Sequence, residues 1–329
     1  MKKIAINGFG RIGRAALKVI LETSEMRVVA VNDLMSIENA AYLFKYDSVY
    51  GVYEGEVGFD DNHLLINDEK ILFLSEKDPA QPPWKDMSID VVIESTGFFT
   101  KKEDAEKHIH AGAKHVVISA PSKSKDTPTV LHGVNSLEEK TSIFSCASCT
   151  TNNIGPVLEI VDRRIGIKKA ILNTIHAYTS SQSLIDAPAK RDLRMGRSAA
   201  INLVPASTGA AIAATKILPQ LEGRFDGIAI RTPVPVGSVS DITFVTSKKT
   251  SADEINKILI EESKTERYKQ VLSTSNEPLV SSDILRSPFA SIVDLKMTRV
   301  VDGDLVKIMA WYDNEWGFTN QMIREVQLL

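Results

Sequence analysis

The sequence predicts an α/β protein with two domains: a doubly wound (Rossmann) domain and an α+β domain with a mainly antiparallel sheet. The chain has 329 residues, more than the roughly 250–300 that one hydrophobic core usually holds. Short apolar segments alternate with helix-length segments in the first half, whereas longer segments rich in β-branched residues dominate the second. We expect domains at residues 1–148 and 149–314, with a C-terminal helix at about 315–329 that returns to the first domain.

The composition is that of an ordinary soluble globular protein and excludes several classes of partner. Hydrophobic residues make up 43% of the chain and charged residues 25%, and the formal net charge is −3. Because the basic residues are dispersed, we expect neither a nucleic-acid nor a membrane partner. No run approaches about 18 apolar residues, and the N-terminus lacks the apolar core of a signal peptide. We therefore expect a cytoplasmic protein.

The chain has two cysteines, Cys146 and Cys149. Two are too few for a disulfide framework or for a four-cysteine zinc site. We expect no bound metal, and a reducing compartment is the simplest setting.

Six short apolar segments in the first half predict the strands of a parallel sheet. They are residues 3–7, 27–32, 71–74, 90–95, 115–119 and 142–145. Helix-length segments separate several of them, as at 11–21 and 102–111, and Gly112 is a C-terminal stop for the latter. Ligands of such sheets bind beyond the carboxyl ends of the strands. The residues that end strands are therefore candidate ligand contacts: Asn7, Asp33, Thr96, Ser119 and the stretch 146–149.

Gly8, Gly10 and Gly13 form a G-x-G-x-x-G motif between the first strand and the first helix. Asp33 follows twenty residues after Gly13, at the end of the second strand. This spacing is typical of dinucleotide binding, in which a pyrophosphate meets main-chain N–H groups at a helix N-terminus. Asp33 is expected to bind the adenosine ribose and to repel a 2′-phosphate, which favours NAD. A glycine turn that serves packing alone is the alternative.

The second half predicts antiparallel strands at residues 229–236, 240–246, 290–300 and 305–312. Ser251 and Glu254 resemble a capping box that opens a helix. Residues 320–326 have helical character and are expected to pack back on the first domain.

Cys149 lies just after the sixth predicted strand and just before a predicted helix at 151–164. A thiol at a helix N-terminus has a lowered pKa and is a candidate nucleophile. A buried inert cysteine and a Cys146–Cys149 redox pair are the alternatives, although the redox pair lacks a thioredoxin-like context. His176, after the apolar segment 170–175, is a candidate base. The sequence does not prove that it meets Cys149, and a structural histidine is its alternative.

Several longer motifs resemble those of phosphorylating glyceraldehyde-3-phosphate dehydrogenase, and the likeness runs nearly end to end. Two are the active-site motifs at residues 147–152 and 176–179, and the others are the opening glycine motif, 46–49, 94–97, 207–211 and 311–316. The resemblance implies oxidation of D-glyceraldehyde 3-phosphate to 1,3-bisphosphoglycerate in glycolysis or gluconeogenesis, with reduction of NAD. It makes Cys149 the nucleophile, through a hemithioacetal and then a thioester that inorganic phosphate cleaves, and His176 the base.

The resemblance also assigns the binding residues. Those for the substrate C3 phosphate are Thr179 and Arg231, and those for the attacking phosphate are Ser148, Thr150, Thr208, Gly209 and Arg197. Those for the cofactor are Arg11 and Ile12 at the pyrophosphate, with Lys77, Ser119 and Asn314. Without the resemblance, the alternative interpretation of Arg231 and Lys77 is a surface charge. The alternative for Thr208 and Gly209 is the start of a helix.

The resemblance implies a homotetramer, because the segment from about 177 to 203 corresponds to a loop that crosses a subunit interface in the family. The chain departs from many members at Cys146, Asn153, Met195 and Phe318. Erythrose-4-phosphate dehydrogenase is the nearest rival, but its relatives lack the intact motifs at 178–179 and 207–211. A non-catalytic NAD-binding or adhesion protein is a second rival, against which the Cys149 and His176 pair argues.

Overall fold

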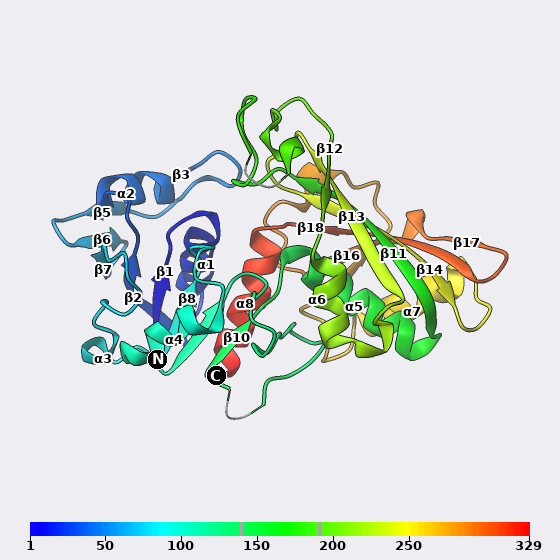
Figure 1. The fold of residues 1–329 in the computed structure, drawn as a ribbon, viewed down its shortest axis with the longest axis horizontal. Helices are drawn as coiled ribbons and strands as arrows, with labels where there is room; N and C mark the ends of the chain where they lie inside the picture. The colour runs from blue at the N-terminus through cyan, green and yellow to red at the C-terminus, as the bar shows by residue number, and fades with distance from the viewer. Residues whose placement is uncertain (139–140, 190–191) are drawn as a thin grey trace. The chain divides into compact units, whose positions relative to one another are not determined.

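The computed structural model describes residues 1–138, 141–189 and 192–329, which form two compact units (Figure 1). The first comprises Met1–Val130, Ser136–Ala147 and Met322–Leu329, and the second comprises Leu131–Asn135 and Ser148–Gln321. Each unit has its own eight-stranded sheet. No helix in the described residues is long and apolar enough to span a membrane.

The sheet of the first unit has the strand order β10-β9-β8-β1-β2-β7-β6-β5. Its parallel strands are β1 (Lys2–Asn7), β2 (Met26–Asn32), β7 (Glu69–Leu74), β8 (Val91–Glu94), β9 (His115–Ile118) and β10 (Ile143–Ser145). Each overlaps a predicted strand, which confirms the doubly wound core. The sequence did not predict the short antiparallel strands β5 (Val57–Phe59) and β6 (His63–Ile66), nor the hairpin of β3 (Tyr46–Asp47) and β4 (Gly51–Val52).

The helices of this unit are α1 (Arg11–Leu21), α2 (Ile37–Lys45), α3 (Trp84–Met87) and α4 (Lys102–His110). The α1 helix has the predicted bounds, and α4 ends one residue before the predicted end. Gly112 adopts a φ of 108°, so the predicted stop is confirmed. Every residue of β8 is buried, as expected for a parallel strand whose two faces are both covered.

The second unit has a mixed but mainly antiparallel sheet. Its order is β12 (Val204–Ser207), β13 (Phe225–Thr232), β11 (Ile167–Ala177), β14 (Ser238–Thr246), β18 (Leu305–Tyr312), β16 (Ser291–Asp294) and β15 (Leu272–Ser275), with β17 (Arg299–Val301) beside β18. The β11–β13 and β15–β16 pairs are parallel. The prediction of one strand over 290–300 is wrong, because a 3₁₀ turn at Leu295–Met297 separates β16 from β17 and buries Leu295.

Three helices of the second unit pack against its sheet: α5 (Cys149–Arg164), α6 (Ala210–Ile217) and α7 (Ala252–Glu262) (Figure 1). Their apolar side chains share one core with the inward-facing residues of β11, β14 and β18. The Ser251 hydroxyl accepts a hydrogen bond from the Glu254 N–H, so the predicted start of α7 is confirmed. The last helix, α8 (Trp316–Leu328), begins in the second unit, and its residues from Met322 onward group with the first.

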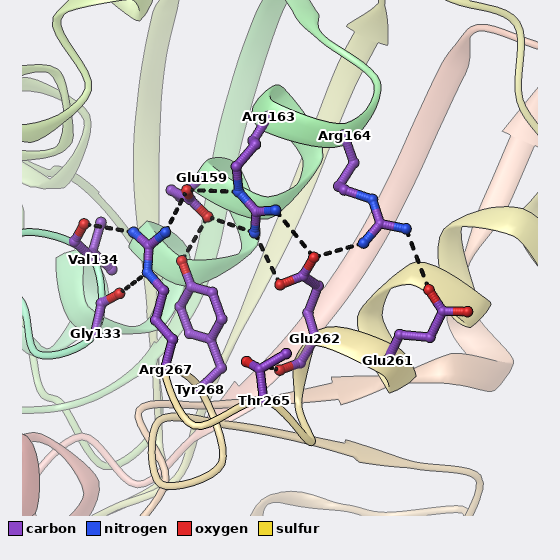
Figure 2. A network of polar contacts seen from close by, with 10 residues as sticks. All are labelled: Gly133, Val134, Glu159, Arg163, Arg164, Glu261, Glu262, Thr265, Arg267 and Tyr268. Atoms are coloured by element: carbon purple, nitrogen blue, oxygen red, sulfur yellow. Dashed lines mark hydrogen bonds and ion pairs between the residues drawn. The ribbon is translucent and has the colours of Figure 1, made fainter.

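A charged network fastens the C-terminal half of α5 (Figure 2). Glu159 on α5 accepts hydrogen bonds from the Tyr268 hydroxyl at 2.6 Å and from Arg267 at 3.1 Å. Glu262 at the end of α7 pairs with Arg163 and Arg164 of α5, at 2.9 and 2.7 Å. Such a network is stronger than isolated surface pairs because the partly buried carboxylates have several donors each. It therefore restrains the helix that begins at Cys149.

We expect Tyr268→Phe to lower the free energy of unfolding by about 1.5–3 kcal/mol, the range for a hydrogen bond to a charged acceptor. The Tyr268 side chain is fully buried, so water cannot replace its hydroxyl as a donor to Glu159. Denaturant-induced unfolding followed by circular dichroism measures the change. Tyr42→Phe removes a hydroxyl from an exposed tyrosine and is the matched control. Equal stability of the two variants would show that the Tyr268–Glu159 bond contributes nothing.

Candidate active site

A cavity of about 790 Å³ lies at the carboxyl edge of the parallel sheet in the first unit. Its walls come from the segments that follow β1, β2, β7 and β8, and they include Gly8, Gly10, Asp33, Lys77 and Thr96. This volume is typical of a small-molecule or cofactor site. Four of the predicted cofactor residues therefore line one cavity. Arg11, Ile12, Gly13 and Ser119 are not among its lining residues, and Asn314 belongs to the second unit.

The three glycines of the motif have different physical roles. Gly8 has a φ of 96°, and a Cβ there would lie 2.5 Å from the Thr96 nitrogen. A Cβ on Gly13 would overlap the carbonyl oxygen of Gly8. A Cβ on Gly10, in contrast, would have no atom within 4 Å. Gly8 and Gly13 are thus required by the turn and by packing, whereas Gly10 leaves open space at the start of α1.

This open space fits a dinucleotide pyrophosphate. Gly10 is the N-cap of α1 and makes no side-chain cap, and a helix N-terminus of this kind favours an anion. The Asp33 carboxylate is held at the same edge by N–H donors from Phe9, at 2.6 Å, and Met35, at 3.0 Å. The Arg11 guanidinium pairs with Asp47 at 2.7 Å, so Arg11 is placed to contribute its main chain.

Cys149 is the first residue of α5, two residues earlier than the predicted start. Ser148 is the N-cap, and its hydroxyl accepts a hydrogen bond from the Thr151 N–H at 3.1 Å. Ala147 has a φ of 57°, a left-handed conformation that is uncommon for alanine. This tight approach places the thiol at the N-terminus of the helix, and strained backbone of this kind occurs frequently at functional sites.

Cys149 and His176 are in contact: the distance from Sγ to Nε2 is 3.4 Å. The imidazole is buried near the end of β11, and its Nδ1 lies 2.6 Å from the Ala177 carbonyl oxygen. When Nδ1–H donates to this carbonyl, Nε2 presents its lone pair to the thiol. The structure therefore brings the predicted nucleophile and base together, with the base oriented by the main chain.

Arg231 is the third member of this cluster. It lies directly opposite His176 in the parallel β11–β13 register. Its Nη1 donates to the Ala177 carbonyl at 3.0 Å and lies 2.7 Å from the His176 Nδ1. A single Nδ1 cannot donate to the carbonyl oxygen and also accept from the guanidinium. In the tautomer with a proton on Nδ1, Arg231 therefore donates to the Ala177 carbonyl oxygen and not to the imidazole. Arg231 thus acts on the imidazole mainly through its positive charge.

The electrostatics favour a neutral pair. Burial raises the pKa of the Cys149 thiol, although Arg231 and hydrogen bonds from Thr150 act in the opposite direction. Burial, and then the charge of Arg231, lower the pKa of His176 to about 4. The prediction of a lowered thiol pKa is therefore wrong in this structure, because desolvation outweighs the helix N-terminus. At neutral pH His176 is an uncharged base that can accept the thiol proton.

Tyr312 is a site residue that the prediction missed, although its motif was noted. Its hydroxyl lies 2.9 Å from the Thr150 Oγ1 and 2.8 Å from the Thr174 Oγ1, and its ring meets the His176 ring edge-on with centroids 5.9 Å apart. Burial raises the pKa of this phenol, so Tyr312 stays protonated. The hydroxyls of Thr150 and Ser148, predicted to bind phosphate, are thus engaged inside the protein.

The other predicted phosphate ligands each have a partner in their own segment. Thr179 bonds to Ser181 at 2.9 Å, and Arg197 pairs with Asp186 at 3.0 Å. The Thr208 hydroxyl accepts from the Ala210 N–H at 3.2 Å, and Gly209 is the N-cap of α6. Residues 190–191 of the predicted interface segment lie outside the described residues. The phosphate roles of these side chains stay predictions.

Hydrogen bonds also hold two predicted cofactor residues that lie outside the cavity. The Asn314 Oδ1 accepts hydrogen bonds from the Gly237 N–H at 3.0 Å and the Ser238 hydroxyl at 3.2 Å. Ser119 follows β9, and its N–H donates to the Glu94 carbonyl at 3.0 Å. No group of three or more potential metal ligands occurs among the His, Cys, Asp and Glu residues that the structure describes.

A doubly wound nucleotide domain and a thiol–imidazole pair in a second domain define a dehydrogenase with a covalent thiol step. Sequence comparison gives the family. The model of the glyceraldehyde 3-phosphate dehydrogenase NAD-binding domain matches residues 2–102, and that of the C-terminal domain of the same family matches residues 148–314. The chain belongs to the glyceraldehyde-3-phosphate dehydrogenase family.

Individual relatives agree over nearly the whole chain. The chain is 45% identical to glyceraldehyde-3-phosphate dehydrogenase of Zymomonas mobilis, over 98% of this chain and 96% of the relative. It is 44% identical to the Thermotoga maritima enzyme of that name, over 100% of this chain and 99% of the relative. It is also 44% identical to the Clostridium acetobutylicum enzyme of that name, over 98% of this chain and 97% of the relative. The protein is thus an NAD-dependent enzyme of the same type.

We expect Gly10→Ala to weaken NAD binding while leaving the melting temperature near that of the parent protein. The added methyl group meets no protein atom and instead occupies the space assigned to the pyrophosphate. Gly13→Ala is the matched comparison, because its methyl group collides with Gly8 and should lower the melting temperature. Calorimetric titration with NAD and thermal unfolding separate the two effects. Full NAD affinity in the Gly10 variant would refute this placement.

We expect His176→Asn to slow alkylation of Cys149 by iodoacetamide at pH 7. Burial raises the thiol pKa in the parent protein, so alkylation there depends on His176 accepting the thiol proton as the sulfur reacts. The variant must react through its free thiolate, whose fraction falls about tenfold for each unit that the pKa lies above the working pH. The rate of the variant should recover as the pH rises through the thiol pKa. Mass spectrometry of the modified peptide measures the rate, and Cys149→Ser shows whether Cys146 reacts. An unchanged rate at pH 7 would mean that the imidazole does not activate the thiol.

Proposed function

We propose that this chain oxidises D-glyceraldehyde 3-phosphate to 1,3-bisphosphoglycerate, as a cytoplasmic enzyme of glycolysis or gluconeogenesis. One observation carries the proposal: in a member of this family, the Cys149 sulfur lies 3.4 Å from the Nε2 of a buried, neutral His176. A thiol beside a neutral imidazole can form a covalent bond to an aldehyde carbon. The intact pair argues against a purely non-catalytic role.

The first half of the reaction uses Cys149 and His176 in turn. The sulfur adds to the aldehyde carbon while its proton passes to the His176 Nε2, and the imidazolium then gives this proton to the new alkoxide, which yields a hemithioacetal and a neutral imidazole. The neutral His176 Nε2 then removes the hydroxyl proton of this adduct, the C=O bond re-forms, and hydride leaves the former aldehyde carbon. NAD, when bound, accepts that hydride. The product on the protein is a thioester of Cys149.

Inorganic phosphate completes the reaction. A phosphate oxygen attacks the thioester carbonyl, the C–S bond breaks, and Cys149 leaves as a thiolate that regains its proton. The acyl phosphate keeps much of the oxidation free energy that hydrolysis would dissipate. We assign the attacking phosphate to Ser148, Thr150, Thr208, Gly209 and Arg197. The Ser148 and Thr150 hydroxyls are already bonded internally, so their main-chain N–H groups and the open face of Gly209 are the better candidates.

We assign the C3 phosphate of the substrate to Arg231 and Thr179. The Nε of Arg231 is buried and has no hydrogen-bond partner among the described residues, which supports an anionic ligand there. A phosphate beside Arg231 offsets the positive charge that lowers the pKa of His176. Substrate binding therefore strengthens the base that activates Cys149.

The cofactor-binding residues can likewise be assigned to separate parts of NAD. The glycine loop, with the main chain of Arg11 and Ile12, receives the pyrophosphate, and the Asp33 carboxylate receives the adenosine ribose and disfavours a 2′-phosphate. We assign Lys77 and Ser119 to the adenosine side and Asn314 to the nicotinamide carboxamide. The assignments of Asp33 and Lys77 are supported by their place in the wall of the cavity. The assignment of Asn314 is supported by the hydrogen bond that fixes its amide.

We further propose a homotetramer. Several apolar side chains of the segment 184–203 are exposed, namely Leu184, Ile185, Leu193, Ile201 and Leu203. Several exposed large apolar side chains in one segment support a protein–protein interface there.

The deciding assay follows NADH formation from D-glyceraldehyde 3-phosphate and NAD, with and without inorganic phosphate. We expect many turnovers with phosphate and at most one per site without it, because the thioester then persists. Cys149→Ser should lose turnover yet keep NAD affinity. Continued turnover without phosphate or arsenate would contradict the phosphorolytic step, and an active Cys149→Ser variant would contradict the nucleophile.

A further inference from the structure

One buried hydroxyl connects the catalytic histidine segment with Asn314. Ser238 begins β14 and is 1% exposed. Its Oγ accepts a hydrogen bond from the Ala177 N–H at 3.1 Å and donates to the Asn314 Oδ1 at 3.2 Å. The hydroxyl therefore accepts a hydrogen bond from one segment and donates a hydrogen bond to the other.

Both segments belong to the proposed chemistry. Ala177 follows His176, and its carbonyl oxygen lies 2.6 Å from the His176 Nδ1, so it accepts the proton of the tautomer that carries one on Nδ1. On the other side, the Asn314 Oδ1 is fixed by two donors, the Ser238 hydroxyl and the Gly237 N–H. An asparagine amide has two orientations of nearly the same shape, and two donors on one atom select the orientation in which that atom is oxygen. The two Nδ2 hydrogens then face away from this pair.

We propose that Ser238 is a positioning residue that orients the Asn314 amide as a donor toward the nicotinamide carboxamide and holds Ala177 in place behind His176. The proposal rests on the function proposed above for Asn314 and His176. Without the hydroxyl, Gly237 alone restrains the amide, and the flipped orientation becomes accessible. The Ala177 N–H also loses a buried acceptor, so the carbonyl that orients the imidazole is less well held.

The same strand offers a matched control. Ser240 lies two residues along β14, is fully buried, and its hydroxyl has no hydrogen-bond partner among the described residues. Ser240→Ala removes the same group from the same strand without breaking a hydrogen bond. Any difference between Ser238→Ala and Ser240→Ala therefore reports the bonds of Ser238 and not the loss of a buried hydroxyl.

The first test titrates each protein calorimetrically with NAD and with ADP-ribose, which lacks the nicotinamide. We expect Ser238→Ala to raise the dissociation constant of NAD about three- to tenfold, the effect of one lost hydrogen bond. Its ADP-ribose affinity should stay at the parent value, and Ser240→Ala should change neither. An unchanged NAD affinity, or an equal loss for both ligands, would overturn the proposal.

The second test needs no cofactor. We expect Ser238→Ala to slow iodoacetamide alkylation of Cys149 by about threefold or more in NAD-free protein, while Ser240→Ala leaves it unchanged. Ser238→Thr keeps a hydroxyl and should restore both readouts. If Ser238→Ala does not fold, Ser238→Cys, whose thiol is a weak donor, should show the same selective loss of NAD affinity. A parent protein that binds NAD but fails the phosphate-dependent assay would defeat the proposed function and leave these binding results to decide the role of Ser238.

Discussion

The contact between Cys149 and His176 is the constraint on which the second unit depends. It joins the first residue of a helix to the end of a strand 27 residues later, so neither element can shift without separating Sγ from Nε2. Ser148 fixes where α5 begins, and the Glu159 and Glu262 network fastens its other half. The β11 strand is held by β13 on one side and β14 on the other. The Cys149 thiol is thus positioned by regular secondary structure, which is more rigid than a loop.

Burial gives this contact its chemical character. Desolvation disfavours the charged form of both groups, so it raises the thiol pKa and lowers the imidazole pKa. Because both shifts oppose an ion pair, the proton stays on sulfur until an electrophile arrives. Such a neutral pair also limits oxidation, since the thiolate is the form that oxidants attack. Cys146 is buried as well, and burial raises its pKa.

Much of the first unit could be predicted from the sequence, because its information is local. Each parallel strand is a short apolar run, and the glycine motif with Asp33 marks the turn and the cavity. The missed strands β5 and β6 are three and four residues long, and pairing with a neighbour defines them more than their own composition does. The break between β16 and β17 was missed for a related reason: the apolar pattern continues through a turn that buries Leu295.

The site of the second unit was predictable as a set of residues but not as a geometry. Nothing in the spacing of Cys149, His176 and Arg231 shows that the parallel register places the last two opposite each other. The thiol pKa was predicted in the wrong direction because a helix terminus is visible in a sequence, whereas desolvation depends on the whole fold. Tyr312 was overlooked for the same reason, since its neighbours Thr150 and Thr174 come from different elements.

Arg231 shows how one side chain can connect two requirements of the reaction. Its charge adds to the effect of burial in keeping His176 uncharged, while its buried Nε lacks a partner within the described chain. A buried cation with an unsatisfied donor is unfavourable by itself, and an anion relieves both costs at once. In the function proposed above, a phosphorylated substrate binds beside Arg231, where its charge would also raise the pKa of the base. On this proposal an unphosphorylated aldehyde would lack that contribution, so discrimination between the two substrates would extend from binding to the activation of Cys149.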